Sequence, residues 1–243
     1  MMYFPPVFDT ATADRLGVES HLERWIAASG QPIGWKRAAP VQPAHGKVLV
    51  VHGNAGTAIQ CAHYADVIQQ VADFDVFLLE FPGYADREGK PTETSLEASA
   101  VEGIENLATN TPVYVVGESL GTGVAAYLAG RCPDQVTGVA LLAPYNSLTS
   151  VAQWHAPVLP VHLLLVDRFP AGKFLQNYHG PVAMLVGGVD QVVPEKFGQR
   201  LFNQYAGPKH LWEFPAADHG AVMQQPPEIW RQIFAFLREA PEK

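Results

Sequence analysis

Short apolar runs alternate along this chain with longer segments of helical composition. Six of these runs are rich in valine, leucine and phenylalanine, and they cover residues 47–51, 75–79, 113–116, 139–142, 182–186 and 210–214. Runs this short and this apolar are typical of strands that are covered on both faces of a parallel sheet. Two further strands are predicted upstream, at 23–28 and 33–37, with a hairpin turn at 29–32 between them. The pattern predicts an α/β fold with a mostly parallel sheet of up to eight strands and helices on both faces.

Helix-compatible composition fills most of the intervals between the strands. The predicted helices cover residues 57–71, 96–108, 120–130, 195–205 and 227–238. Near the start of the second helix, Thr94 and Glu97 have the spacing of a capping box. In that motif the hydroxyl and the carboxylate each accept a hydrogen bond from a free backbone N–H.

Residues 145–180 interrupt the alternation. Pro157, Pro160 and Pro170 divide an apolar stretch there, which predicts a short helical insertion. Two interpretations stay open, because the segment suits either core helices or a small cap over a site. The sequence contains no repeat, low-complexity tract or linker. We therefore expect a single domain over residues 1–243 with a cap-like insertion at 145–180.

The composition excludes several classes of protein. The chain has 243 residues, of which 48% are hydrophobic and 16% charged, so it is long and apolar enough to bury one sizeable core. The formal net charge of -8 and the absence of a basic run argue against a nucleic-acid partner. The two cysteines, Cys61 and Cys132, are too few to indicate a disulfide framework.

Targeting signals are not indicated either. The apolar residues 1–8 lack the basic flank of a signal peptide, and no run reaches the roughly 18 uninterrupted apolar residues of a membrane span. We expect a soluble, cytoplasmic protein without a transmembrane span. The sequence leaves open the oligomeric state and whether residues 1–8 touch a membrane or a partner.

The most informative segment runs from a predicted strand through Gly117-Glu118-Ser119-Leu120-Gly121 into a predicted helix. A serine on such a sharp strand-to-helix turn has a strained backbone, and the glycines on either side let neighbouring chains pass closely. Its hydroxyl is then exposed at the carboxyl edge of the sheet. The N–H of Leu120 points to where an oxyanion would form. Ser119 is therefore a candidate nucleophile, with a merely structural turn as the alternative.

A second glycine-bracketed turn follows the strand at 47–51. Acyl transfer through a tetrahedral intermediate needs two N–H donors, and the N–H of Asn54, between Gly53 and Gly56, is our candidate to complement Leu120. We interpret His52, in the same turn, as a positioning residue.

Two more candidates follow the last two predicted strands. A serine hydroxyl needs a base to take its proton and a third group to orient that base. His219 and Asp190 are predicted to fill these roles, because each follows a strand and the chain order Ser, Asp, His is the one such a fold uses. Asp218 adjoins His219, but its side chain should point elsewhere. Asn146 occupies an alternative acid position, but an amide cannot stabilise an imidazolium as a carboxylate does.

Metal and dinucleotide sites are not indicated. The sequence has no H-E-x-x-H, C-x-x-C or calcium-loop pattern, which argues against a metal site. Residues 121–126 superficially match a dinucleotide fingerprint. The match begins inside a predicted helix, however, and no acidic residue ends the following strand. We interpret these glycines as sites of close helix–strand packing.

Together these motifs resemble the α/β-hydrolase fold and, more narrowly, the Bem46-like serine hydrolases. The resemblance extends from about residue 20 to the C-terminus and rests on residues 52–56, 80–84, 117–121, 143–145, 159–161, 167–169, 190, 193–194 and 218–220. It implies Ser119 as nucleophile, Asp190 as acid, His219 as base and no cofactor. The sequence departs from the family at Ala85, where relatives commonly carry glycine, and it has no full-length N-terminal anchor of the kind some relatives carry.

From these residues we expect a serine hydrolase that cleaves small-molecule carboxylic esters or thioesters through an acyl-enzyme. Tyr84, Tyr145 and Trp154 are predicted to form apolar walls for the substrate. Two alternatives remain: an amidase or peptidase with the same triad, and a non-catalytic binding protein on the same fold.

Overall fold

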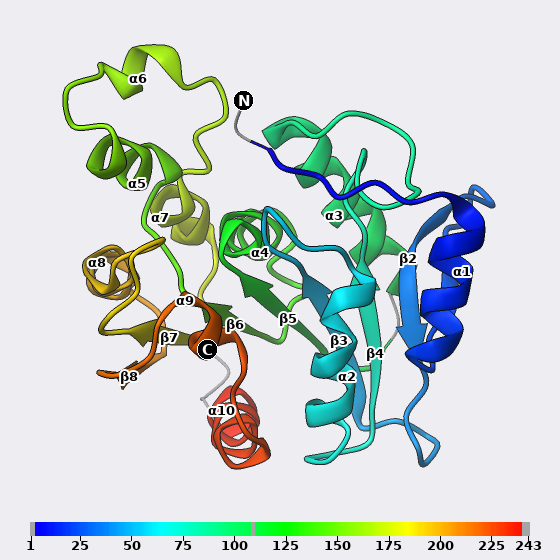
Figure 1. Ribbon diagram of the computed structural model, residues 1–243. Coiled ribbons are helices and arrows are strands. Elements are labelled where there is room, and N and C mark those ends of the chain that lie inside the picture. The colour runs from blue at the N-terminus through cyan, green and yellow to red at the C-terminus, as the bar shows by residue number, and fades with distance from the viewer. Residues whose placement is uncertain (1–2, 108–109, 240–243) are drawn as a thin grey trace.

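An eight-stranded sheet forms the centre of the molecule in the computed structural model, which describes residues 3–107 and 110–239 (Figure 1). The strands are β1 (Glu23–Ile26), β2 (Pro32–Arg37), β3 (Gly46–Val51), β4 (Phe74–Leu79), β5 (Val113–Glu118), β6 (Gly138–Leu142), β7 (Val182–Gly187) and β8 (Lys209–Phe214). Their order is β1-β2-β4-β3-β5-β6-β7-β8, and all neighbours are parallel except β1–β2 and β2–β4. The predicted mostly parallel sheet is confirmed, including the hairpin between its first two strands.

Helices cover both faces of this sheet. They are α1 (Thr10–Glu19), η1 (Ile59–Cys61), α2 (Ala62–Ile68), α3 (Glu93–Leu107), α4 (Leu120–Arg131), α5 (Leu148–His155), α6 (Val161–Leu164), α7 (Ala171–Phe174), η2 (Leu175–Asn177), α8 (Glu195–Gln204), α9 (His219–Met223) and α10 (Pro227–Glu239). Helices α2 and α10 pack together on one face, and α3 and α4 pack together on the other (Figure 1). Each of the five predicted helices is present with shifted ends. The predicted last residue of the second, Ala108, lies outside the described residues.

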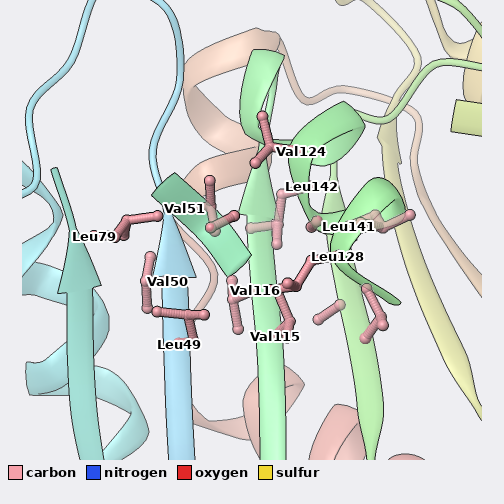
Figure 2. Packing of buried hydrophobic residues seen from close by; sticks show 14 of the residues in the cluster. Leu49, Val50, Val51, Leu79, Val115, Val116, Val124, Leu128, Leu141 and Leu142 are labelled. Carbon is pink, nitrogen blue, oxygen red and sulfur yellow. The ribbon is translucent and has the colours of Figure 1, made fainter. Parts of the chain in front are cut away.

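The central strands are buried on both faces, which explains why their sequences do not alternate. All four residues from Val48 to Val51 of β3 are at most 1% exposed, and Leu141 of β6 is fully buried. Figure 2 shows side chains of β3, β5 and β6 gathered near Val124 and Leu128 of α4. Each fully buried side chain of this size stabilises the fold by about 1.5–3 kcal/mol. The result is a rigid support for the loops that follow the strands.

The insertion between β6 and β7 divides into two parts. Helix α7 and η2 pack against α4, with Ala171 and Leu175 buried, so this part belongs to the core. Helices α5 and α6 project away from the sheet (Figure 1). The core interpretation therefore applies to α7 and η2, and a cap formed by α5 and α6 stays a prediction.

The sequence analysis made one wrong prediction about a helix end and missed one helix. The capping box predicted at Thr94 and Glu97 is wrong, because α3 begins at Glu93. Thr92 and Ser95 form the reciprocal pair instead: the Ser95 N–H donates to the Thr92 hydroxyl at 3.1 Å, and the Thr92 N–H donates to the Ser95 hydroxyl at 2.9 Å. Helix α1 was not predicted, because it buries only Ala13 and Gly17 and so has no clear apolar periodicity.

Candidate active site

Ser119 occupies a sharp turn between β5 and α4. Its backbone has φ 49° and ψ -117°, in a region that L-residues seldom adopt, and its N–H is held by the Leu142 carbonyl of β6 at 2.9 Å. A Cβ on Gly121 would lie 2.3 Å from the Val51 carbonyl oxygen, and one on Gly117 would lie 2.6 Å from the Gly121 carbonyl oxygen. Because neither position has room for a side chain, the two glycines are what allow the turn to form.

Ser119, His219 and Asp190 meet at the carboxyl edge of the parallel strands. The Ser119 Oγ lies 3.0 Å from the His219 Nε2, and the His219 Nδ1 lies 2.7 Å from the Asp190 Oδ2. With Nδ1 protonated toward the carboxylate, Nε2 is free to accept the serine proton. The three side chains come from segments after β5, β7 and β8, so the parallel sheet brings them to one edge.

The surroundings of Asp190 hold its carboxylate in place. Asp190 is 3% exposed, and its Oδ1 accepts hydrogen bonds from the N–H groups of Val192 and Val193, both at 2.8 Å. Hydrogen bonds from two backbone donors stabilise the charged form of a buried carboxylate and fix its orientation. Asp218 has a separate role, because it caps α9 by accepting the Ala221 N–H at 2.9 Å.

The turn after β3 passes directly beside Ser119, the candidate nucleophile. A Cβ on Gly53 would lie 3.4 Å from the Ser119 Cβ, and the Gly53 N–H donates to the Glu118 Oε1 at 3.0 Å. Asn54 follows at once, and its side-chain Oδ1 accepts the Tyr84 hydroxyl at 2.9 Å. Leu120, on the other side of Ser119, is the first residue of α4, and an N–H there has no acceptor within the helix. Of the two predicted oxyanion residues, Leu120 directly follows Ser119, and Asn54 follows Gly53, which packs against Ser119.

A model of the α/β hydrolase fold family matches residues 47–171 of the chain. The chain belongs to this family. The match covers the turn with Asn54, the nucleophile turn and the first part of the insertion, which are the segments that carry most of the resemblance seen in the sequence.

Similar proteins from several organisms support the assignment of this chain to the α/β hydrolase family. An uncharacterised protein of Mycobacterium tuberculosis is 34% identical over 177 residues, which cover 71% of this chain and 62% of that protein. The lysophosphatidylserine lipase ABHD12 of Danio rerio is 27% identical over 209 residues, which cover 77% of this chain and 54% of that protein. The chain therefore spans about three fifths or less of the length of these relatives. Relatives of the ABHD12 type fit the Bem46-like branch that the motifs indicate.

A solved structure agrees on the fold. Est1E of Butyrivibrio proteoclasticus, with ferulic acid bound, matches with a TM-score of 0.70 over 88% of this chain and 98% of that chain, at 15% sequence identity. At this identity the likeness establishes the α/β-hydrolase fold, and the chemistry has to be argued from the side chains of this chain.

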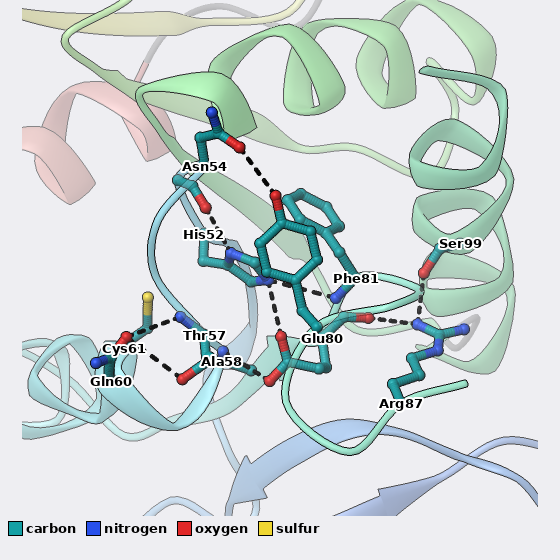
Figure 3. A network of polar contacts seen from close by, with 12 residues as sticks. His52, Asn54, Thr57, Ala58, Gln60, Cys61, Glu80, Phe81, Arg87 and Ser99 are labelled. Atoms are coloured by element: carbon teal, nitrogen blue, oxygen red, sulfur yellow. Dashed lines mark hydrogen bonds and ion pairs between the residues drawn. The ribbon is translucent and has the colours of Figure 1, made fainter. Parts of the chain in front are cut away.

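Two carboxylates of this α/β hydrolase, the buried Glu80 and the partly buried Glu118, support the turn at 52–58, and the sequence analysis missed both. Glu80, 2% exposed, lies 2.9 Å from the His52 Nε2 through one oxygen and accepts the Ala58 N–H at 3.0 Å through the other (Figure 3). Glu118 accepts the Gly53 N–H from the opposite side. The available signal was an acidic residue at the end of each of two apolar strands, since charged groups are rarely buried without a partner. The placement of His52 agrees with the positioning role interpreted from the sequence.

Two of the three predicted apolar walls, Tyr84 and Tyr145, are buried, and the role of Trp154 stays a prediction. Tyr84 and Tyr145 are fully buried; the Tyr84 hydroxyl bonds to Asn54, and the Tyr145 hydroxyl donates to the Leu120 carbonyl at 3.1 Å. These two rings have no exposed surface that could face a substrate, and their hydroxyls instead contact Asn54 and Leu120, the two candidate oxyanion residues. Trp154 is 39% exposed on α5, where the Lys196 Nζ lies 4.9 Å from its ring centroid.

Metal-binding side chains do not gather in the part of the chain that the structure describes. Within it, no three His, Cys, Asp or Glu side chains are placed to hold an ion. Cys61 and Cys132 are both free thiols. Burial raises the pKa of Cys61, with the Glu118 carboxylate adding to the effect.

Proposed function

We propose that this α/β hydrolase cleaves carboxylic esters or thioesters of small molecules through a covalent acyl-enzyme. The observation that carries the proposal is the continuous hydrogen-bond relay from Asp190 through His219 to the Ser119 hydroxyl. A buried carboxylate, an oriented imidazole and a hydroxyl on a strained turn are the parts that acyl transfer by a serine nucleophile requires. The esterase and lipase relatives and structural neighbours support the same class of reaction.

The first half-reaction acylates the enzyme. The His219 Nε2 takes the Ser119 proton as Oγ attacks the acyl carbon, and Asp190 stabilises the resulting imidazolium. The N–H groups of Asn54 and Leu120 stabilise the negative charge that develops on the acyl oxygen. When the tetrahedral intermediate collapses, the bond to the alcohol or thiol breaks, and His219 returns the proton to that leaving group.

The second half-reaction repeats these steps with water. His219 removes a proton from a water molecule that attacks the acyl carbon, and the bond to the Ser119 Oγ then breaks. The proton returns to Oγ, and the carboxylic acid is released. The same groups act in both halves, so no further reactant is needed.

Covalent labelling tests this proposal. A fluorophosphonate should add one adduct to the chain, which peptide mapping places on Ser119. Ser119→Ala should abolish the adduct and lower kcat for a p-nitrophenyl ester by about 10⁴-fold to 10⁶-fold. Ser29→Ala, at an exposed turn between β1 and β2, is the matched control and should keep both the adduct on Ser119 and the parent kcat. Near-normal turnover by folded Ser119→Ala would refute the assignment.

The leaving group separates the proposal from an amidase or peptidase with the same triad. We expect turnover of a p-nitrophenyl ester and of a thioester with the same acyl group, and far slower turnover of the matching p-nitroanilide. Comparable rates on the anilide would favour the amidase interpretation.

A further inference from the structure

The projecting part of the insertion exposes a group of large apolar side chains. Val158, Leu159, Leu163, Leu164 and Val166 are 91%, 51%, 74%, 64% and 87% exposed. Single exposed leucines are ordinary on protein surfaces, but five within nine residues form a patch of the kind that marks an interaction surface. We call this segment, residues 157–166, the apolar turn.

The Gln153 side chain of α5 binds backbone polar groups at the start of the apolar turn. The Gln153 amide nitrogen donates to the carbonyls of Ala156, Pro157 and Leu159 at 3.1, 3.2 and 2.9 Å. Its amide oxygen accepts the Val161 N–H at 3.3 Å. One polar side chain from α5 thus binds three backbone groups of the apolar turn, together with the Ala156 carbonyl that precedes it.

Arg168 binds two further backbone carbonyls at the other end of the apolar turn. Its guanidinium donates to the carbonyls of His162 and Leu165 at 3.3 and 3.4 Å. Two more backbone groups are paired within the turn: the Leu163 N–H donates to the Pro160 carbonyl at 2.9 Å, and the Leu165 N–H donates to the Val161 carbonyl at 2.8 Å. A loop in water has no need to satisfy its backbone internally, whereas a segment in an apolar medium must do so.

Charge restricts what the apolar turn can contact. Residues 135–166 include no Asp, Glu, Lys or Arg, although the chain has a formal net charge of -8. Attraction to an anionic surface needs clustered basic residues, and this segment has none. Burial of apolar side chains is the remaining source of binding energy, which favours a neutral or zwitterionic surface.

The apolar turn is linked to the catalytic acid. The preceding helix, α5, ends at His155, whose Nε2 lies 2.9 Å from the Val192 carbonyl oxygen. Val192 in turn donates its N–H to Asp190. Val189 and Val192, on either side of Asp190, are themselves about half exposed. The apolar surface therefore approaches the rim of the site.

We propose that the apolar turn inserts into the surface of a zwitterionic phospholipid bilayer and holds the chain there. A second copy of this chain is a poorer occupant, because a stable protein interface buries about 800 Å² on each partner. The apolar turn has only ten residues, and it lies in a part of the insertion that projects away from the sheet (Figure 1). The binding step does not depend on the proposed ester hydrolysis. It uses none of the triad residues.

Vesicle cosedimentation tests the proposal, with the full chain carrying Ser119→Ala so that lipid is not consumed. We expect binding to pure phosphatidylcholine vesicles that is unchanged by 0.5 M NaCl and not strengthened by phosphatidylserine. Leu163→Asp should weaken binding by about tenfold or more. Val18→Asp is the matched control, since Val18 on α1 is also 74% exposed but lies outside the insertion, and it should bind as the parent does. Thermal melting establishes that both variants are folded.

Several outcomes would overturn the proposal. They are no binding of the parent to phosphatidylcholine, equal losses in the Leu163 and Val18 variants, or binding only to anionic vesicles at low salt. Light scattering measures whether the chain forms dimers. If the parent is dimeric and does not bind vesicles, and Leu163→Asp is monomeric, the apolar turn is a self-association surface. If the Ser119→Ala chain binds vesicles but Ser119 of the unsubstituted chain does not react with a fluorophosphonate, this proposal stands and only the proposed function is refuted.

Discussion

Glu118 joins the nucleophile turn to the turn that carries Asn54. Its Oε1 accepts the Gly53 N–H at 3.0 Å, and its Oε2 accepts the Tyr64 hydroxyl at 2.7 Å. Because Glu118 directly precedes Ser119, one side chain sets the distance between the two candidate oxyanion donors. Preorganised donors are effective only when they already point at the developing charge. We infer that Glu118 is a positioning residue.

Substitution of Glu118 tests this role. Glu118→Ala should lower kcat by about 10²-fold, as the loss of one oxyanion donor does, with a smaller change in KM. Glu118→Gln keeps an oxygen that accepts the Gly53 N–H and should recover most of the rate. Tyr64→Phe removes only the second hydrogen bond and is the control. An alanine variant that melts earlier but turns over normally would make Glu118 a purely structural residue.

Single residues of the site differ in how far the sequence reveals them. Ser119, Asp190 and His219 were predicted and are in contact, because each follows a strand and parallel strands end at one edge. Glu80 and Glu118 were missed, because their partners lie 22 to 65 positions away in the chain. Tyr84 and Tyr145 were misplaced as substrate walls, because an aromatic residue near a site can be a buried support as well as part of a binding surface.

At the scale of elements, strands were predicted more accurately than helix ends. A strand covered on both faces needs an unbroken apolar run, so burial and sequence coincide in β3, β5, β6 and β7. Helix ends depend on single capping side chains, and several positions near residue 93 have suitable chemistry. The threonines at 92 and 94 both qualify from sequence, and only the structure identifies the first as the cap.

The two threonines give a direct test of where α3 begins. Thr92→Ala should lower the free energy of unfolding by about 1 kcal/mol, the usual contribution of an N-cap side chain. Thr94→Ala, two residues along and also exposed, should change it far less. Chemical denaturation of both variants measures the difference. Equal losses, or a larger loss for the second variant, would contradict the observed start of the helix.

At the scale of the whole molecule, α3 is also where the insertion is fastened to the rest of the fold. The Glu93 carboxylate accepts the N–H groups of Arg168 and Phe169 at 2.6 and 2.8 Å, and the Glu93 N–H donates to the Asp167 Oδ1 at 3.0 Å. Glu97 lies one helical turn further on. Its partial burial, followed by the negative charges of Glu93 and Asp167, raises its pKa to about 7. A third negative charge at this junction is therefore unfavourable.

The raised pKa of Glu97 makes stability depend on pH. Its folded-state pKa lies above its ordinary value of 4.5, so the folded chain binds the proton more tightly than the unfolded chain. The stabilising contribution is complete below about pH 4.5 and is lost as the pH rises through about 7. Glu97→Gln should therefore raise the melting temperature relative to the parent at pH 8 and change it little at pH 4.5. Glu105→Gln, exposed on the same helix, is the control and should show no such pH dependence. If Glu97→Gln had the same effect at both pH values, the carboxylate would not be the group that loosens this junction, and the insertion would be held by Glu93 and Asp167 whatever the charge at position 97.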